Sequence, residues 1–378
     1  MAEQTPVLIL DRKPAPDRSE RGTFCTDLPA AADPALVARA ASARQALEDE
    51  VVILGHHYQK QEVIQFADAR GDSYKLAKYA AETGRPYVIF LGVHFMAESA
   101  DILTGDDVQV ILPDMAAGCS MADMAELGQV EEAWAVLQDI APGRVVPLTY
   151  MNSAADIKAL TGREGGAICT SSNAQAAMRW GFEQRDKVLF LPDQHLGRNT
   201  AAWMGLSLDD CVVWNPHQDQ GGLTEDQVAR AKVILWRGHC SVHQRFRPEM
   251  VDAVRERLPG VKVIVHPECR YDVVSKADVV GSTETIIRTV AESEPGTKWA
   301  VGTELNLVTR LGLENPDKTV AFLDRTVCYC ATMNRIDLPH LVWVMENLLN
   351  GVVVNRISVE PDTARWARVA LERMLQIT

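Results

Sequence analysis

The sequence has few of the features that mark membrane, secreted or nucleic-acid-binding proteins. No apolar stretch approaches the roughly 20 residues that a membrane-spanning helix needs. The first residues hold only a short apolar run with charges on its far side, unlike a secretory signal. Basic residues are also scarce, since 38 Lys and Arg against 51 Asp and Glu give a net charge of −13. Nucleic acids are bound by clustered cations. We therefore expect a cytoplasmic protein that binds neither membranes nor nucleic acid.

Several common catalytic motifs are missing as well. The sequence contains no G-x-G-x-x-G, no Walker loop, no H-E-x-x-H and no G-x-S-x-G. Dinucleotide-binding, nucleotide-triphosphate, zinc-protease and serine-hydrolase functions therefore lose their main support. The chain does contain eight cysteines within an ordinary globular composition of 47% hydrophobic and 24% charged residues. In a reducing compartment such cysteines indicate metal binding or catalysis before disulfides.

The hydrophobic pattern predicts an α/β fold. Short β-branched runs alternate with amphipathic helical segments, as in parallel sheets that helices cover on both faces. The runs are VVILG, YVIFLG, VQVILP, VVPLTY, GAICT, VLFLP, CVVW, KVILW, VKVIV, DVVGS and WAVGT. Before them we expect an irregular arm and a helix from Pro34 to about Glu50, with Asp33 as its N-cap. The segment NPHQDQGGLTEDQ is interpreted as an inserted surface loop and helix.

The runs also show a threefold repeat of small parallel-sheet units. In each unit a strand ends in a pair of polar residues, a hydroxyl follows before a helix, and a cysteine comes last. The spacing from His56 to Cys119 is 63 residues and that from His266 to Cys330 is 64. We predict an arm and helix at 1–50, then pseudo-symmetric units at 51–130, 131–258 and 259–378, the last with C-terminal helices. The landmarks are His56, Tyr58, Ser73 and Cys119 in the first unit, Tyr150, Asn152, Ser171 and Cys240 in the second, and His266, Glu268, Thr283 and Cys330 in the third.

The repeat-equivalent cysteines suggest that each unit offers one thiolate to a shared centre. Three thiolates do not complete a tetrahedral structural zinc site, but they can hold a [4Fe–4S] cluster with one iron open. An open iron is a Lewis acid suited to dehydration chemistry. Cys328 competes with Cys330, because residues two apart share a face of an extended segment. The other cysteines are interpreted as structural, with Cys269 ambiguous: Cys25, Cys169, Cys211 and Cys269.

Zinc is the alternative metal, since Cys240 and His243 have the spacing of a ligand pair. No second close pair completes a zinc finger or ribbon, so His243 is better interpreted as a side chain aimed at substrate. The three hydroxyl residues can each act as a helix N-cap, and helix N-termini also favour bound anions. The polar strand ends supply acid–base candidates around one cavity.

These motifs resemble the quinolinate synthases, iron–sulfur enzymes of de novo NAD biosynthesis. The resemblance runs from about Val51 to Leu348. It rests on the ordered series GHHYQ, GDS, AGCSMADM, TYMNS, TSSNA, PDQHLG, GHCSVH, HPE, GST and CATMN. It implies three pseudo-symmetric domains around one [4Fe–4S] cluster. It also implies condensation of iminoaspartate with dihydroxyacetone phosphate to quinolinate, with loss of phosphate and water, and a functional link to an L-aspartate oxidase.

The resemblance also implies roles for individual residues. Cys119, Cys240 and Cys330 match the cluster ligands, Tyr58 matches the catalytic tyrosine, and His243 matches the histidine after the second ligand. Glu268 is expected to move protons. The substrate-binding positions fall on His56, Ser73, Tyr150, Asn152, Ser171, His266, Glu268 and Thr283.

One departure and two rival functions stay open. Some family members have C-x-x-C-x-x-C at the last ligand, whereas this chain has only Cys328-Tyr329-Cys330, so a dithiol switch there is in doubt. A [4Fe–4S] hydro-lyase acting on one hydroxy acid is a rival enzyme. A non-catalytic iron–sulfur metabolite sensor is a rival of another class.

Overall fold

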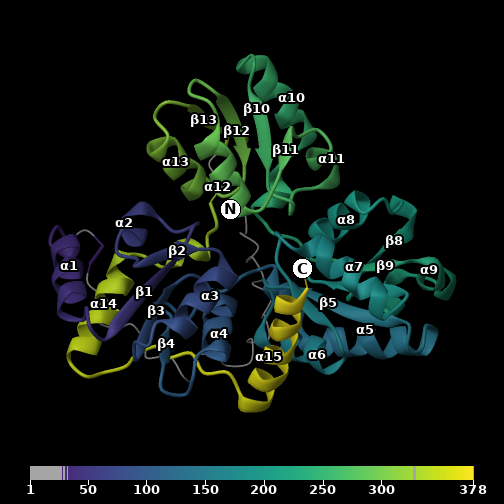
Figure 1. The fold of residues 1–378 in the computed structure, drawn as a ribbon, viewed down its shortest axis with the longest axis horizontal. Helices are drawn as coiled ribbons and strands as arrows, with labels where there is room; N and C mark the ends of the chain where they lie inside the picture. The colour runs from purple at the N-terminus through teal and green to yellow at the C-terminus, as the bar shows by residue number, and fades with distance from the viewer. Residues whose placement is uncertain (1–27, 29, 32, 327–328, 378) are drawn as a thin grey trace, which may run out of the picture.

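A computed structural model describes residues 28, 30–31, 33–326 and 329–377 of the chain, and it contains three α/β units around a common centre (Figure 1). Each unit is built on a parallel sheet with the same order of strands. In sheet order, the first unit has β2 (Ala69–Gly71), β1 (Val51–His56), β3 (Tyr87–Leu91) and β4 (Gln109–Ile111). The third has β11 (Val279–Val280), β10 (Lys262–Val265), β12 (Lys298–Gly302) and β13 (Thr319–Phe322).

The middle unit repeats this order and adds one edge strand. Its sheet runs β6 (Ala167–Cys169), β5 (Val145–Tyr150), β7 (Lys187–Leu191), β9 (Val233–Trp236) and β8 (Cys211–Trp214). The predicted loop and helix near Gly221 are confirmed as η4 (Asp219–Gly222) and α9 (Glu225–Arg230). The extra strand β8 pairs in parallel with β9 on the outside of the sheet. The insert therefore lengthens the middle repeat without separating its strand ends.

The predicted α/β class and the threefold architecture are confirmed. All eleven apolar runs form strands, and every residue of β1, β5 and β7 is buried, as expected for sheets covered on both faces. The sequence pattern missed β2 and β13. Both are edge strands without a fully buried run, so the hydrophobic signal is weak there.

Helices connect the strands and cover the sheets. They are α1 (Leu36–Ala46), α2 (Gln61–Ile64), α3 (Ser73–Glu82), α4 (His94–Leu103), α5 (Leu127–Ile140), α6 (Ala155–Arg163), α7 (Ala174–Gln184), α8 (Gln194–Trp203), α10 (Pro248–Arg257), α11 (Tyr271–Val274), α12 (Thr283–Glu292), α13 (Leu305–Glu314), α14 (Leu338–Leu349) and α15 (Pro361–Gln376). Among the described residues, none of these helices has both the length and the apolar character that crossing a membrane requires.

The start of α1 differs from the prediction. The helix begins at Leu36 rather than Pro34, and its N-cap is Ala35 rather than Asp33. Asp33 instead accepts a hydrogen bond from the Ala35 backbone N–H at 2.8 Å, before the helix begins, and forms an ion pair with Arg39. The acidic residue therefore anchors the turn that leads into the helix.

The two C-terminal helices do not pack on the third sheet. The helix α14 packs against α1 in the first unit, and α15 packs against α6 in the second (Figure 1). The chain thus returns across the molecule after its third unit. The domain boundaries at residues 50, 130 and 258 stay predictions, and we propose that the C-terminal helices belong spatially to the first two units.

Candidate active site

The carboxyl ends of the three sheets meet around one cavity. Every predicted cluster ligand and substrate-binding residue lines it, and so does Tyr58. His243 lies directly behind this lining, where it is 1% exposed and hydrogen-bonded to Glu268. The site residues that line the cavity are His56, Tyr58, Ser73, Cys119, Tyr150, Asn152, Ser171, Cys240, His266, Glu268, Thr283 and Cys330. The tertiary structure therefore brings together residues that lie up to 274 positions apart in the sequence.

The three cysteines occupy equivalent local structures. Each follows the fourth strand of its sheet and lies three residues before a 3₁₀ turn: η2 (Ala122–Met124), η5 (His243–Arg245) or η6 (Met333–Arg335). Each cysteine carbonyl accepts a hydrogen bond from the backbone N–H four residues later, at 2.9–3.0 Å. Each sulfur also accepts a backbone hydrogen bond from the first residue of its turn. The predicted repeat thus extends to the backbone around each thiol.

This donor set suits a metal cluster held by thiolates. Burial raises the pKa of all three thiols, to about 12 for Cys119, and the neighbouring cysteines add to the shift for Cys119 and Cys240. Burial and mutual repulsion disfavour thiolates unless positive charge balances them. Iron supplies that charge, and the backbone N–H groups at the sulfurs are the hydrogen bonds that tune such clusters. The residues present therefore fit an iron–sulfur cluster.

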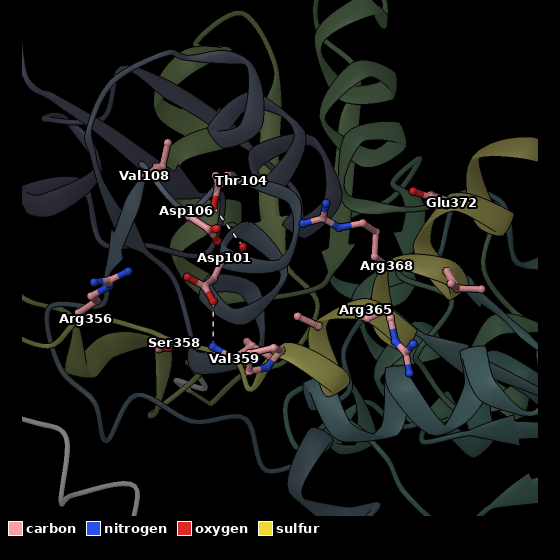
Figure 2. A pocket seen from close by; sticks show the side chains of 14 residues that line it. Asp101, Thr104, Asp106, Val108, Arg356, Ser358, Val359, Arg365, Arg368 and Glu372 are labelled. Carbon is pink, nitrogen blue, oxygen red and sulfur yellow. Dashed lines mark hydrogen bonds between the residues drawn. The ribbon is translucent and has the colours of Figure 1, made fainter.

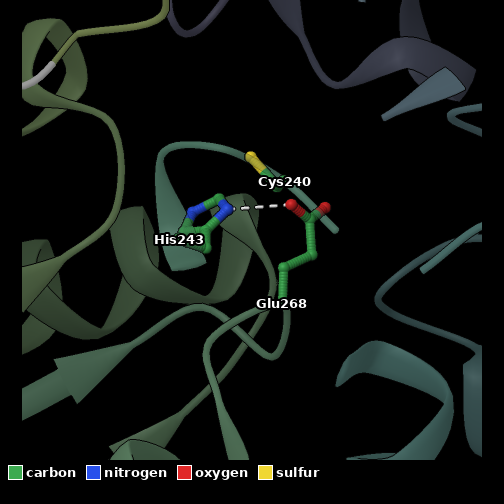
Figure 3. Close-up of side chains that lie close together, drawn as sticks. All are labelled: Cys240, His243 and Glu268. Carbon is green, nitrogen blue, oxygen red and sulfur yellow. Dashed lines mark hydrogen bonds and ion pairs between the residues drawn. The ribbon is translucent and has the colours of Figure 1, made fainter. Parts of the chain in front are cut away.

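The zinc alternative is less well matched. One ligand atom from each of Cys240, His243 and Glu268 lies within 4.8 Å of the others (Figure 3). Nδ1 of His243 and Oε2 of Glu268 are only 2.8 Å apart, a hydrogen-bond distance. Two ligands on one tetrahedral zinc ion would be about 3.3 Å apart, given bonds of about 2.0–2.1 Å. The trio is therefore arranged as a hydrogen-bonded acid–base pair beside a cysteine.

Local hydrogen bonds set the tautomers of two histidines. Nδ1 of His56 accepts the backbone N–H of Tyr58 at 3.2 Å, and Nδ1 of His266 accepts that of Glu268 at 3.3 Å. Each ring must therefore carry its proton on Nε2. Burial lowers the pKa of both histidines to about 3. Both rings are neutral hydrogen-bond donors near neutral pH, at equivalent points of the first and third units.

A continuous hydrogen-bond chain crosses all three units. Tyr150 donates its hydroxyl to Oε1 of Glu268 at 2.7 Å, and Oε2 pairs with Nδ1 of His243. Nε2 of His243 lies 3.1 Å from Oγ1 of Thr303, which lies 3.0 Å from the Tyr58 hydroxyl. The two predicted proton-transfer residues, Glu268 and Tyr58, are thereby connected through His243 and Thr303.

The chain starts with Glu268 ionised and Tyr58 protonated. Burial acts to raise the pKa of Glu268, but the His266 and His243 rings and the hydrogen bonds from His243 and Tyr150 outweigh it, so the pKa lies below its usual value. Burial, with the negative charge of Glu268, raises the pKa of Tyr58 well above its usual value. A carboxylate that can accept a proton and a phenol that can donate one therefore lie on the same hydrogen-bond chain.

The N-cap interpretation of the hydroxyl residues is wrong by one or two positions. Asp72 caps α3 by accepting the Lys75 N–H, and Ser282 caps α12 by accepting the Thr285 N–H. Ser73 and Thr283 are the first helical residues, and Ser171 precedes Asn173, the N-cap residue of α7. Since Asp72 and Ser282 make the caps of α3 and α12, the hydroxyls of Ser73 and Thr283 are free to face the cavity. Thr283 lies 3.2 Å from the Tyr58 hydroxyl.

Thr303 is the site residue that the sequence analysis missed. It follows β12 directly, is completely buried and bridges Tyr58 and His243. Its position after a strand was a signal for a site residue. It was missed because it belongs to none of the three repeating landmarks. Cys25 and Cys328 lie outside the described residues, whereas Cys169 and Cys269 are buried free thiols and Cys211 is a half-buried one.

A second hollow lies outside the junction, between the end of α4 and the start of α15 (Figure 2). Its lining balances three arginines against three acidic residues and contains no predicted site residue. Asp101 accepts the Val359 N–H there at 2.8 Å, and Arg368 donates to the Ile102 carbonyl. These contacts join the C-terminal segment to the first unit. The candidate acid–base residues line the junction cavity or lie directly behind it instead.

Comparisons with known proteins show which family the chain belongs to. The family model described as "Quinolinate synthetase A protein" matches residues 40–376. A quinolinate synthase from a Nocardioides species is 62% identical over 371 residues, covering 95% of this chain and 94% of the relative. One from Streptomyces coelicolor is 60% identical, covering 98% and 95%, and one from Geobacillus kaustophilus is 54% identical, covering 90% and 93%. A solved D-lactate dehydrogenase from a Sporolactobacillus species covers 84% of this chain and 89% of its own, at a TM-score of 0.19 and 9% identity, too low to support an argument.

Proposed function

Because the chain belongs to the quinolinate synthase family, an enzyme family of NAD biosynthesis, we propose that it condenses iminoaspartate with dihydroxyacetone phosphate, forming quinolinate and releasing phosphate and water. The observation that carries this proposal is the hydrogen-bond chain from Glu268 to Tyr58, which lies beside three cysteines from three units. Iminoaspartate is the oxidised form of aspartate, so we also propose a functional link to an L-aspartate oxidase. A cytoplasmic location stays a prediction.

Cys119, Cys240 and Cys330 would hold a [4Fe–4S] cluster, whose open iron would supply a Lewis acid for substrate oxygens. The rest of the cavity lining combines the polar site residues with apolar side chains such as Phe95, Met96 and Val242. Neutral His56 and His266 present Nε2–H donors to the carboxylates of the substrate, and neutral donors avoid the cost of burying extra charge. The other proposed contacts to anionic groups come from Ser73, Tyr150, Asn152, Ser171 and Thr283.

The relay moves protons during the elimination of water. The Tyr58 hydroxyl lines the cavity and donates its proton to a departing substrate hydroxyl, leaving a phenolate. The proton lost from substrate carbon passes to the carboxylate of Glu268. It then returns through His243 and Thr303 to the phenolate, which restores the starting state. Positioned acid–base groups of this kind contribute about 10²–10⁴-fold to rates.

Thr303→Val tests the relay, because it removes the bridging hydroxyl and keeps the branched shape. Protein purified without oxygen would receive dihydroxyacetone phosphate and iminoaspartate generated in situ, and quinolinate would be measured by chromatography. We expect wild-type protein to form quinolinate and T303V to lose about 100-fold in kcat. Thr161→Val is the matched control, since Thr161 is equally buried but donates only within α6.

Two results would overturn parts of this proposal. Wild-type protein that forms no quinolinate from these substrates would refute the reaction and favour a hydro-lyase acting on one hydroxy acid. A T303V variant that keeps the kcat of T161V would refute the relay alone.

A further inference from the structure

Each unit has a helix directly after its third strand, and the sixth residue of each helix is buried against the next unit. These helices are α4, α8 and α13, and their sixth residues are Ser99, Asn199 and Arg310. Ser99 and Asn199 are completely buried and Arg310 is 5% exposed. A buried polar side chain must find hydrogen-bond partners, so these partners show what the position does.

All three residues contact the segment that follows the first strand of the neighbouring unit. Asn199 of the second unit donates Nδ2 to the carbonyls of Pro267 and Cys269 in the third, both at 2.8 Å. These carbonyls flank Glu268 in the sequence. The amide therefore holds the turn that presents the carboxylate to the relay.

The other two interfaces have a contact at the equivalent position. Arg310 of the third unit donates to the His57 carbonyl of the first at 2.8 Å, between His56 and Tyr58. Oγ of Ser99 in the first unit lies 3.7 Å from Sδ of Met151 in the second. In the sequence, Met151 lies between two site residues, Tyr150 and Asn152. The contacts thus run from unit one to two, from two to three and from three back to one.

The three contacts between units differ in strength. The Asn199 amide makes two neutral hydrogen bonds and the Arg310 guanidinium makes a charge-assisted one. Ser99 has one hydroxyl proton, which its own helix takes through the Phe95 carbonyl at 2.8 Å, so its contact with sulfur is weak. The two strong contacts hold Glu268 and Tyr58, the two ends of the proton relay.

We propose that Ser99, Asn199 and Arg310 form a closed ring of positioning residues that sets the relay geometry across the unit interfaces. The three residues lie outside the cavity lining and contact no relay atom. Asn199 and Arg310 act through backbone carbonyls next to site residues, and Ser99 acts through the side chain of Met151. It rests on the proposed function for its kinetic effect but not for its geometry. A relay whose members come from three separate units needs such fixed points, because a misplacement of about 1 Å can cost about 100-fold in rate.

Asn199→Asp is the central test, because it keeps the size of the side chain and replaces both donors with an oxygen facing two carbonyls. We expect kcat to fall about 100-fold with a smaller change in KM, since the substitution replaces no cavity-lining side chain. Asn355→Asp is the matched control. Asn355 is also buried and donates Nδ2 to a proline carbonyl, that of Pro113, outside the cavity lining. N355D should lower the unfolding temperature as N199D does and keep kcat.

Arg310 gives a second test if N199D does not fold. Arg310→Met removes the donor and should reduce kcat about 100-fold, and Arg310→Lys, which keeps a cationic donor, should recover at least about tenfold of that loss. A kcat for N199D equal to that of N355D, or equal losses in R310M and R310K, would overturn the proposal.

The geometry can be tested without turnover. If wild-type protein forms no quinolinate, the proposed function fails, and crystal structures then decide on the ring. Displacement of Glu268 from His243 in N199D, or of the Tyr58 hydroxyl from Thr303 in R310M, would support it. Unchanged distances in both variants would overturn it.

Discussion

At the scale of the residue, burial keeps several histidines neutral. It lowers the pKa of His56 and His266 to about 3 and that of His195 to about 4. His56 and His266 can therefore bind anions only as neutral donors. His195 lies 2.5 Å from the side-chain oxygen of Gln244, which only accepts, so its Nε2 carries the proton.

These lowered values predict that acid destabilises the protein. Between pH about 4 and 6.5 the folded His195 stays neutral while the unfolded histidine binds a proton, so stability falls as the pH falls through that window. Each such group contributes about 1.4 kcal/mol per pH unit where it is fully active. We expect His195→Gln to make the fall in unfolding free energy shallower by about 1 kcal/mol per pH unit, measured by urea unfolding. Equal slopes in wild type and H195Q would contradict this, and His217→Gln, at an exposed histidine, serves as the control.

At the scale of the element, the 3₁₀ turn after each cysteine shows where the threefold repeat is broken. The turn brings backbone N–H groups to the sulfur, and its first residue differs between the three units. In the second unit that first residue of the turn is His243, and in the other units it is Ala122 or Met333. One of three equivalent turns therefore carries the histidine of the hydrogen-bond chain, and the repeat is broken at this position.

The packing of α15 on α6 is close enough to require glycine. A Cβ built on Gly162 of α6 would lie 2.0 Å from the Trp366 carbonyl oxygen of α15, and a backbone atom cannot move aside alone. We expect Gly162→Ala to destabilise the protein by about 1–3 kcal/mol, the usual cost of overpacking. Gly128→Ala in α5 is the control, because open space surrounds that position and alanine favours helix there. A thermal unfolding temperature for G162A at or above that of G128A would refute the prediction.

At the scale of the whole molecule, the thiols that suit a cluster come from three units, so a bound cluster would link all three. Cys119→Ser, Cys240→Ser and Cys330→Ser should each lose most of the iron, sulfide and visible absorption after anaerobic reconstitution. Each should also unfold at a lower temperature than loaded wild type, because a group that binds only the folded state stabilises it. Cys211→Ser, at a half-buried thiol in β8, should keep the cluster. Retention of full iron by any of the three variants would remove that cysteine from the ligand set.

Much of the site could be predicted from the sequence because it repeats. Strand ends such as His56 and His266, and cysteines at nearly equal spacing, lie at fixed points of a βα pattern that local hydrophobic periodicity reveals. Parallel strands place their carboxyl ends on one edge of a sheet, so the pattern predicted which residues lie at that edge of each unit. That the three edges face one centre was inferred from the equivalent cysteines and from the family resemblance.

The sequence by itself determined the α/β class, the three units and the side chains that line the cavity, because each depends on local periodicity and on motifs within one unit. Only the tertiary structure decided which residues connect the three units at the site. Thr303 completes the relay, and Asn199 and Arg310 hold its ends, through contacts between residues 60 to 253 positions apart. Such contacts depend on the relative placement of whole units, and no local pattern in the chain encodes that placement.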